Sequence, residues 1–88
     1  MRIDKFLKVS RIIKRRTLAK EVCEGGRIQV NGRPAKAGTE VKPGDRVSIR
    51  FPRKLLEIEI NTIKENASVA EAPTLYVILK EEYIAEES

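Results

Sequence analysis

The residues most able to do chemistry in this chain are cations near its beginning. The first twenty residues hold eight Lys and Arg side chains and one acid, Asp4. Guanidinium and ammonium groups form charge-assisted hydrogen bonds with phosphate oxygens. A solvated charged face is the usual explanation for a basic helix, but here almost no neighbouring acid is present to neutralise it. The pattern therefore predicts a surface that binds a phosphate-rich partner.

We expect the contacts to come from cations around the junction of two helices, together with the start of the following hairpin. Asp4 is expected to be structural, either orienting Arg2 or Arg11 or favouring the positive end of the first helix. The amide of Asn31 is most simply explained by turn geometry, although the tip of the hairpin could also touch RNA backbone. The candidate RNA-binding residues are Arg2, Lys5, Arg11, Lys14, Arg15, Arg16, Lys20, Arg27, Asn31 and Lys36.

The composition argues against catalysis. The chain of 88 residues has no His, no Trp and one Cys, which removes most routes to metal sites, nucleophilic catalysis and disulfide bonds. We therefore expect no enzyme activity, no catalytic residue, no metal and no cofactor. Cys23 is expected to be a small buried apolar residue, and a single Cys fits a reducing cytosol.

Aromatic residues are too few to indicate binding through base stacking. Phe6 and Phe51 fit core positions, while Tyr76 and Tyr83 fall in the acidic part of the chain, so structured RNA contacted through phosphates is the better prediction. A DNA-binding regulator is the alternative, because two short helices joined by a turn resemble a helix-turn-helix. A protein-interaction module with a solvated basic face is a third possibility.

Charge is divided unevenly along the sequence. Residues 1–54 hold sixteen Lys and Arg against five acids, a net charge of +11, whereas residues 55–88 hold two against eight, a net charge of −6. This division indicates that one surface meets phosphate and another avoids it. No segment has the length and apolar character of a signal peptide or membrane span, so we expect a cytoplasmic monomer with no membrane attachment.

The apolar spacing predicts two helices at the start of an α+β fold. Ile3, Phe6 and Leu7 follow the i, i+3, i+4 rule in a helix over residues 3–9. A second helix is expected to begin after an N-cap at Thr17 and to run to about residue 24. Its expected apolar stripe is Leu18, Ala19, Val22 and Cys23, and Gly25 and Gly26 end it.

A small, mostly antiparallel sheet is expected to follow the helices. The alternating segments are 28–30, 46–50 and 56–60, with Val47 and Ile49 facing inward. Asn31 and Gly32 form the dipeptide preferred in two-residue hairpin turns, and the partner strand begins near Arg33.

The last segment is ambiguous between strand and helix. Residues 75–79 have strand composition, yet Pro73 can begin a helix that buries Leu75, Ile78 and Leu79. We favour a short C-terminal helix. The expected organisation is an RNA-binding domain over residues 1–64, with its core motif at 1–50, and an acidic C-terminal extension over residues 65–88.

Four segments together resemble a known RNA-binding family, the domain named for the fourth protein of the small ribosomal subunit and also called the αL motif. The matching segments are Arg2–Leu7, Arg16–Lys20, Gly26–Gly32 and the turn Lys42–Asp45. They cover roughly residues 1–50, and their combination in this order is specific for the domain. The motif also occurs beside catalytic domains in pseudouridine synthases and a tRNA synthetase, for which this chain leaves no room.

Within that family the chain is most similar to the bacterial ribosome-associated quality control factors, the RqcP group. The resemblance implies binding to a large ribosomal subunit that still carries peptidyl-tRNA after a stalled ribosome has split. The implied partners are large-subunit rRNA, tRNA and an RqcH-type factor, whose alanine tailing of the nascent chain it would support. The family's basic positions fall on Arg2, Arg11, Arg15, Arg16 and Lys20.

A heat-shock-type ribosome recycling or biogenesis factor is the alternative within the family. The fifteen-kilodalton heat-shock relative carries a longer basic extension. This chain ends instead in acids, which favours the quality control group; the acids are Glu81, Glu82, Glu86 and Glu87.

Overall fold

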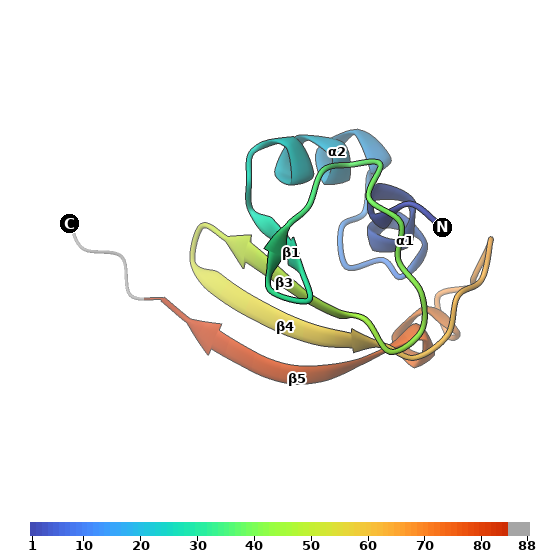
Figure 1. Ribbon diagram of the computed structural model, residues 1–88. Helices are drawn as coiled ribbons and strands as arrows, with labels where there is room; N and C mark the ends of the chain where they lie inside the picture. The colour runs from blue at the N-terminus through green and yellow to red at the C-terminus, as the bar shows by residue number, and fades with distance from the viewer. Residues whose placement is uncertain (85–88) are drawn as a thin grey trace.

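Two short helices lie over one face of a curved sheet in the computed structural model, which describes residues 1–84 (Figure 1). The sheet has five strands in the order β2-β1-β3-β4-β5, and every neighbouring pair is antiparallel. The expected α+β class, with two helices before a small antiparallel sheet, is confirmed. The elements in chain order are α1 (Ile3–Val9), α2 (Arg16–Glu24), β1 (Ile28–Val30), β2 (Arg33–Pro34), β3 (Arg46–Phe51), β4 (Lys54–Ile60), the 3-10 turn η1 (Ala72–Leu75) and β5 (Tyr76–Tyr83).

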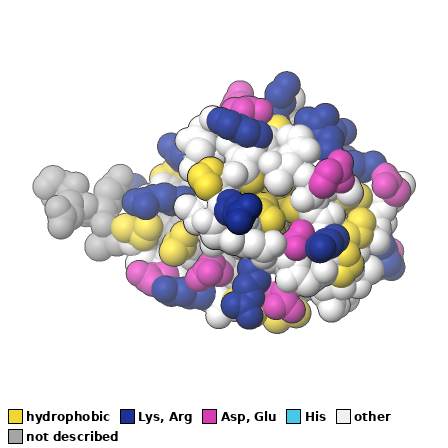
Figure 2. Space-filling view, viewed as in Figure 1, with side chains coloured by type: hydrophobic (Ala, Val, Ile, Leu, Met, Phe, Trp, Pro, Cys, Tyr) yellow, Lys and Arg dark blue, Asp and Glu magenta, His cyan; other side chains and the backbone are white. Residues whose placement is uncertain are grey.

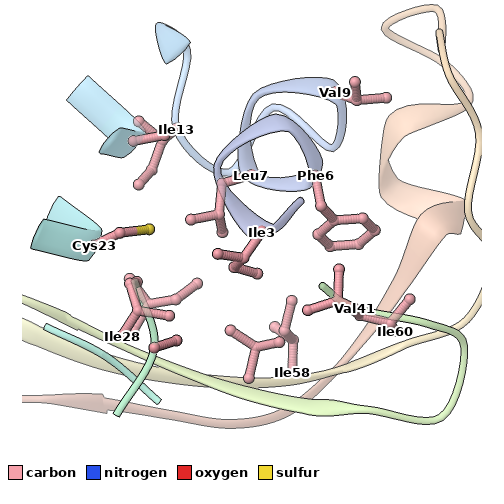
Figure 3. Packing of buried hydrophobic residues seen from close by; sticks show 14 of the residues in the cluster. Ile3, Phe6, Leu7, Val9, Ile13, Cys23, Ile28, Val41, Ile58 and Ile60 are labelled. Carbon is pink, nitrogen blue, oxygen red and sulfur yellow. The ribbon is translucent and has the colours of Figure 1, made fainter. Parts of the chain in front are cut away.

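The core forms where α1 packs on the inner face of the sheet. Ile3, Phe6 and Leu7 are fully buried, as their spacing predicts. Figure 3 shows these side chains directed toward Ile58 and other sheet residues. Each such burial stabilises the fold by about 1.5–3 kcal/mol. Because this face of α1 is fixed against the sheet, Lys8 is left on the exposed side of the helix.

The second helix begins two residues earlier than expected, and the prediction of Thr17 as its N-cap is wrong. Arg15 is the N-cap: its backbone is extended, with φ −120° and ψ 134°, and no side chain caps the helix. The carbonyl of Arg15 accepts a hydrogen bond from the Ala19 amide at 3.0 Å. That bond closes the first turn of α2, so Thr17 already lies inside the helix.

The apolar stripe of α2 is narrower than expected. Ala19 and Cys23 are fully buried, but Leu18 is 48% exposed. Ala19 and Cys23 are four residues apart, so they lie above one another on the helix, and Leu18 lies at the edge of this stripe. The expected burial of Leu18 is therefore wrong, while that of Cys23 is confirmed.

The predicted hairpin between β1 and β2 is confirmed. Asn31 has φ 52° and Gly32 has φ 79°, the positive values that a type I′ turn requires at both central positions. The Asn31 amide nitrogen Nδ2 donates to Asp45 Oδ1 at 3.1 Å, and its Oδ1 accepts from the Arg46 backbone amide at 2.9 Å. Both polar groups of this side chain are thus used within the protein.

The predicted C-terminal helix is wrong, because residues 76–83 form β5. This strand pairs with β4 along its whole length, from Ile60 opposite Tyr76 to Lys54 opposite Tyr83. Pro73 lies in the short turn η1. Pairing with β5 satisfies the backbone N–H and C=O groups of β4 that would otherwise form an open sheet edge. The spacing of apolar residues within 75–79 carries no information about this pairing.

Two of the three side chains expected to be buried by that helix are only partly buried in β5, and the third, Leu75, lies in η1. Leu75 is fully buried, whereas Ile78 and Leu79 are 52% and 45% exposed. A register shift lies opposite Glu57 and Ile58, which pair with Lys80 and Ile78 and leave Leu79 without a partner. The proposed division at residue 64 stays a prediction, and Glu86 and Glu87 lie outside the described residues.

Candidate nucleic-acid interface

The first turn of α1 is fastened to the loop that precedes β3. The Ile3 amide donates to the Thr39 carbonyl at 2.8 Å, and the Asp4 amide donates to the Ala37 carbonyl at 3.3 Å. Arg2 forms an isolated β-bridge with Glu40. These contacts hold the backbone of Arg2 and Asp4 in place, so their side chains project from a fixed position.

Asp4 is a buried carboxylate that holds two guanidinium groups. Its side chain is 2% exposed, and its Oδ2 accepts a hydrogen bond from Arg2 Nη2 at 3.3 Å and lies 3.6 Å from Arg16 Nε. Its Oδ1 accepts from the Lys5 backbone amide at 2.8 Å. The side chains of Arg2 and Arg16 stay about half exposed, at 47% and 49%, so N–H donors remain for a ligand. Asp4 thus orients Arg2, which is one of the alternatives considered from the sequence, and Arg16, which was not foreseen.

A hollow of about 290 Å³ lies beside this arrangement. It is lined by Arg2, Asp4, Arg16, Thr17 and Lys20. Lys20 is four residues after Arg16 on α2 and therefore lies on the same side of that helix. The hollow carries three positive charges and one negative charge, a net charge of +2, which suits a phosphate group.

A second basic group lies at the end of α1. Lys8, Arg11 and Lys14 line a hollow of about 190 Å³ together with residues of the loop before η1. Arg11 has φ 62°, a left-handed conformation that is uncommon for a residue with a Cβ. Its Nη2 donates to the Ala67 carbonyl at 3.5 Å. Lys8 was not among the predicted contacts, although its spacing of three residues from Arg11 on a helical pattern could have indicated it.

Acids far away in the sequence neutralise two of the candidate cations. Lys5 forms an ion pair with Glu65, sixty residues later in the chain. The bond from Lys5 holds the pKa of the Glu65 carboxyl below its ordinary value. Lys36 Nζ lies 3.9 Å from Glu24 Oε2. The scarcity of acids between Arg2 and Lys20, where Asp4 is the one acid, therefore did not reveal how much of the positive charge is paired.

Four candidate cations in the helical region form no ion pair with any described residue. They are Arg11, Lys14, Arg15 and Lys20, all exposed. Figure 2 shows Lys and Arg side chains gathered over the helices at the top and upper right of the molecule, with a few acids between them. Arg27 lies apart from this group, in a hollow on the sheet. We call the surface formed by Arg2, Lys8, Arg11, Lys14, Arg15, Arg16 and Lys20 the helical basic surface.

The side chains of the helical basic surface can form charge-assisted hydrogen bonds with phosphate oxygens. Among residues 1–84 no three His, Cys, Asp or Glu side chains are placed to hold a metal ion. The one thiol, at Cys23, is fully buried. Burial, and then the negative charges of Asp4 and Glu24, raise its pKa from 9.0 to about 11.

Within residues 1–84 no helix combines the length and apolar character needed to span a bilayer.

Comparison with known proteins agrees with this geometry. Residues 1–47 match the S4 domain family. The chain is 65% identical to the RQC P-site tRNA stabilizing factor of Halalkalibacterium halodurans, over 97% of each chain. It is 56% identical to the factor of the same name from Bacillus subtilis, over 98% of this chain and 100% of the relative.

A solved structure with a similar fold is the trimeric heat shock protein 15 of Vibrio cholerae. Its TM-score is 0.83 at 33% sequence identity, and the match covers 89% of this chain and 80% of that one.

Proposed function

Because the chain belongs to the S4 domain family and, within it, to the RQC P-site tRNA stabilizing factors, we propose that it binds the large ribosomal subunit after stalling and holds the P-site tRNA there. In this proposal it contacts both rRNA and tRNA. It acts without catalysis, in the cytoplasm, and supports alanine tailing of the nascent chain by an RqcH-type factor. It binds as a monomer.

The observation that carries the proposal is the pair of guanidinium groups fixed by Asp4 beside Lys20, which forms no ion pair within residues 1–84. A buried carboxylate sets the direction of both arginines before any ligand arrives, so little side-chain entropy is lost on binding. Phosphate contacts of this kind fix the position of a protein on folded RNA without reading its sequence. This matches a factor that must recognise the shape of a ribosomal site.

The contact residues we propose are the candidates named from the sequence, with different weights. Arg2, Arg11, Lys14, Arg15, Arg16 and Lys20 lie on the helical basic surface. Lys5 and Lys36 would have to exchange a carboxylate for a phosphate, and Asn31 would contribute backbone groups of the turn.

Salt dependence gives the first test of the proposal. If about five cations contact phosphate, the logarithm of the affinity for large subunits falls with the logarithm of salt concentration at a slope of about −4. The measurement is co-sedimentation of the labelled protein with purified subunits, with and without P-site tRNA. An affinity that does not change with salt would contradict phosphate binding.

Replacing Lys20 with Gln separates binding from folding. Because Lys20 has no ion-pair partner among residues 1–84, its loss leaves the melting temperature unchanged and weakens subunit binding by about threefold to tenfold. Lys42→Gln is the matched control, since Lys42 is also an exposed lysine without such a partner and lines none of the three hollows described.

A second candidate function is that of a heat-shock-type recycling or biogenesis factor, which the similarity in fold to heat shock protein 15 supports. The two functions differ in their need for tRNA. A P-site tRNA stabilising factor binds more tightly to subunits that carry P-site tRNA. Equal affinity for empty and tRNA-loaded subunits would favour the second function.

A further inference from the structure

The face of the sheet turned away from the helices carries its own basic hollow. Its volume is about 360 Å³. Val47 and Ile49 of β3 point into the core, so the residues that alternate with them, Ser48 and Arg50, point to the open face. The residues that line the hollow are Gly26, Arg27, Gln29, Ser48, Arg50, Leu55 and Glu57.

Two arginines lie directly opposite each other in this hollow. Ile28 pairs with Ile49, and the Arg50 amide donates to the Arg27 carbonyl at 2.9 Å, which continues the same antiparallel register by one residue. Arg27 and Arg50 therefore project from neighbouring positions on the same face. Like charges placed opposite each other in a sheet destabilise it, so the pair needs an explanation outside the packing of the fold.

No described residue neutralises this arginine pair. Neither guanidinium takes part in an ion pair within residues 1–84. The residue opposite Arg50 on β4 is Leu55, where an acid would neutralise it. Glu57 lines the same hollow, but it lies opposite Ser48 on one side and Lys80 on the other, and it forms no ion pair with either arginine.

Other cations on the strands of this sheet show what a neutralised position looks like. Arg46 lies on the open face of the same strand as Arg50, and its Nε is 3.7 Å from Glu59 Oε1, its cross-strand partner. Lys54 Nζ lies 3.3 Å from Glu81, and Lys80 Nζ lies 3.1 Å from Glu82. The sheet thus supplies acids to Arg46, Lys54 and Lys80, whereas Arg27 and Arg50 form no ion pair with any residue among 1–84.

We propose that Arg27 and Arg50 form a second phosphate-binding site for an RNA backbone, on the opposite side of the sheet from the helical basic surface. The amide of Gln29 and the hydroxyl of Ser48 supply neutral hydrogen-bond donors beside the two guanidinium groups. This inference rests on the proposed function, which it deepens. A protein with phosphate sites on two faces can lie between two RNA segments, one on each face, and the second segment is either rRNA or tRNA.

The test compares Arg50→Gln with Arg46→Gln, two neutralising changes on one face of one strand. Affinity is measured over a range of salt concentrations with three probes: large subunits, large subunits carrying P-site tRNA, and tRNA alone. We expect Arg50→Gln to weaken binding by about threefold to tenfold and to lower the magnitude of the salt slope by about 0.7–0.9, the value for one lost phosphate contact. Arg46→Gln should change affinity by less than about twofold, because Glu59 already neutralises Arg46.

The three probes identify the source of the phosphate. A loss seen with empty subunits assigns the contact to rRNA, and a loss seen only with tRNA-loaded subunits or tRNA alone assigns it to tRNA. A structural role is tested by the melting temperature. Removing one arginine of the like-charge pair should leave the melting temperature unchanged or raise it. A lower melting temperature that accounts for the lost binding would overturn the proposal.

Failure of this inference can be told apart from failure of the proposed function. If Lys20→Gln weakens binding while Arg50→Gln and the double variant Arg27→Gln/Arg50→Gln match Arg46→Gln, the second site is refuted and the first stands. If the unaltered protein binds none of the three probes, the proposed function itself fails.

Discussion

At the scale of single residues, Asp4 determines the direction of the cations around it. Among residues 1–84 it is one of three buried polar or charged residues, with Ser10 and Asp45. Its two side-chain oxygens accept from Arg2 and from a backbone amide at the start of α1, and Oδ2 also lies near Arg16. This orienting role explains why a carboxylate lies within a candidate phosphate site.

Replacing Asp4 with Asn tests orientation against simple charge. The variant gains one unit of net positive charge, so a model based on total charge predicts tighter RNA binding. We expect weaker binding, by several fold, because Arg2 and Arg16 lose their common anchor. We also expect a loss of about 1–3 kcal/mol in the free energy of unfolding, the usual range for a hydrogen-bonded charged group that loses its partner. Binding assays and urea unfolding measure both.

The control for that change is Glu40→Gln. Glu40 is an acid near the same helix that pairs with the N-terminal ammonium, but its side chain is 75% exposed. Its replacement should change stability by less than about 0.5 kcal/mol. Tighter binding by Asp4→Asn would show that orientation of the two arginines contributes little.

Cys23 gives a prediction that depends on pKa. Burial raises its pKa to about 11 from 9.0, so at pH 8 the native thiolate is about a hundredfold scarcer than in the unfolded chain. Native protein should react with a thiol reagent at least about a hundredfold more slowly than protein in denaturant. Since the neutral thiol is the form favoured by the fold, its contribution to stability is complete below pH 9 and declines as pH rises toward 11. Rapid native labelling at pH 8 would contradict the burial.

At the scale of elements, the turn between α1 and α2 combines an unfavourable backbone conformation with a basic side chain. Arg11 adopts φ 62°, which costs about 1–2 kcal/mol for a residue with a Cβ and little for Gly. A left-handed residue that carries a guanidinium group toward a basic hollow is consistent with a binding role.

A pair of substitutions at Arg11 separates these two properties. Arg11→Gly and Arg11→Ala both remove the guanidinium, so both should weaken RNA binding to the same extent. The free energy of unfolding of Arg11→Gly should be about 1 kcal/mol higher than that of Arg11→Ala, because Gly has no Cβ to strain the turn. Thermal and urea melts compare the two. Equal stabilities would show that the turn is not strained.

The last strand shows what local patterns miss at the element scale. Residues 75–79 fit either a helix or a strand, and the choice of strand follows from the free edge of β4, which pairs with β5 over its full length. The first helix was predictable with its bounds because the apolar residues that define it all lie within its own seven residues. An element whose partner lies elsewhere in the chain lacks such a local signature.

At the scale of the whole molecule, the division of charge along the sequence becomes a division between surfaces. The acids of the second half neutralise cations of β3, β4 and β5 or, in the case of Glu65, reach back to Lys5 on α1. The cations that remain unpaired within residues 1–84 include Lys14, Arg15 and Lys20 on the helical basic surface and Arg27 and Arg50 on the open face. A molecule charged on two faces suits a position between RNA segments.

The sequence by itself determined the two helices, the type I′ turn at Asn31 and Gly32, and the concentration of cations in the first half. These properties depend on residue type and on spacing within a few positions, which a local pattern records. Only the tertiary structure decided that Asp4 holds Arg16, that Glu65 neutralises Lys5 and that Arg27 lies beside Arg50. Each of these depends on chain segments that meet only when the core and sheet form, because Coulomb and hydrogen-bond contacts act over a few ångströms of space whatever the separation in sequence.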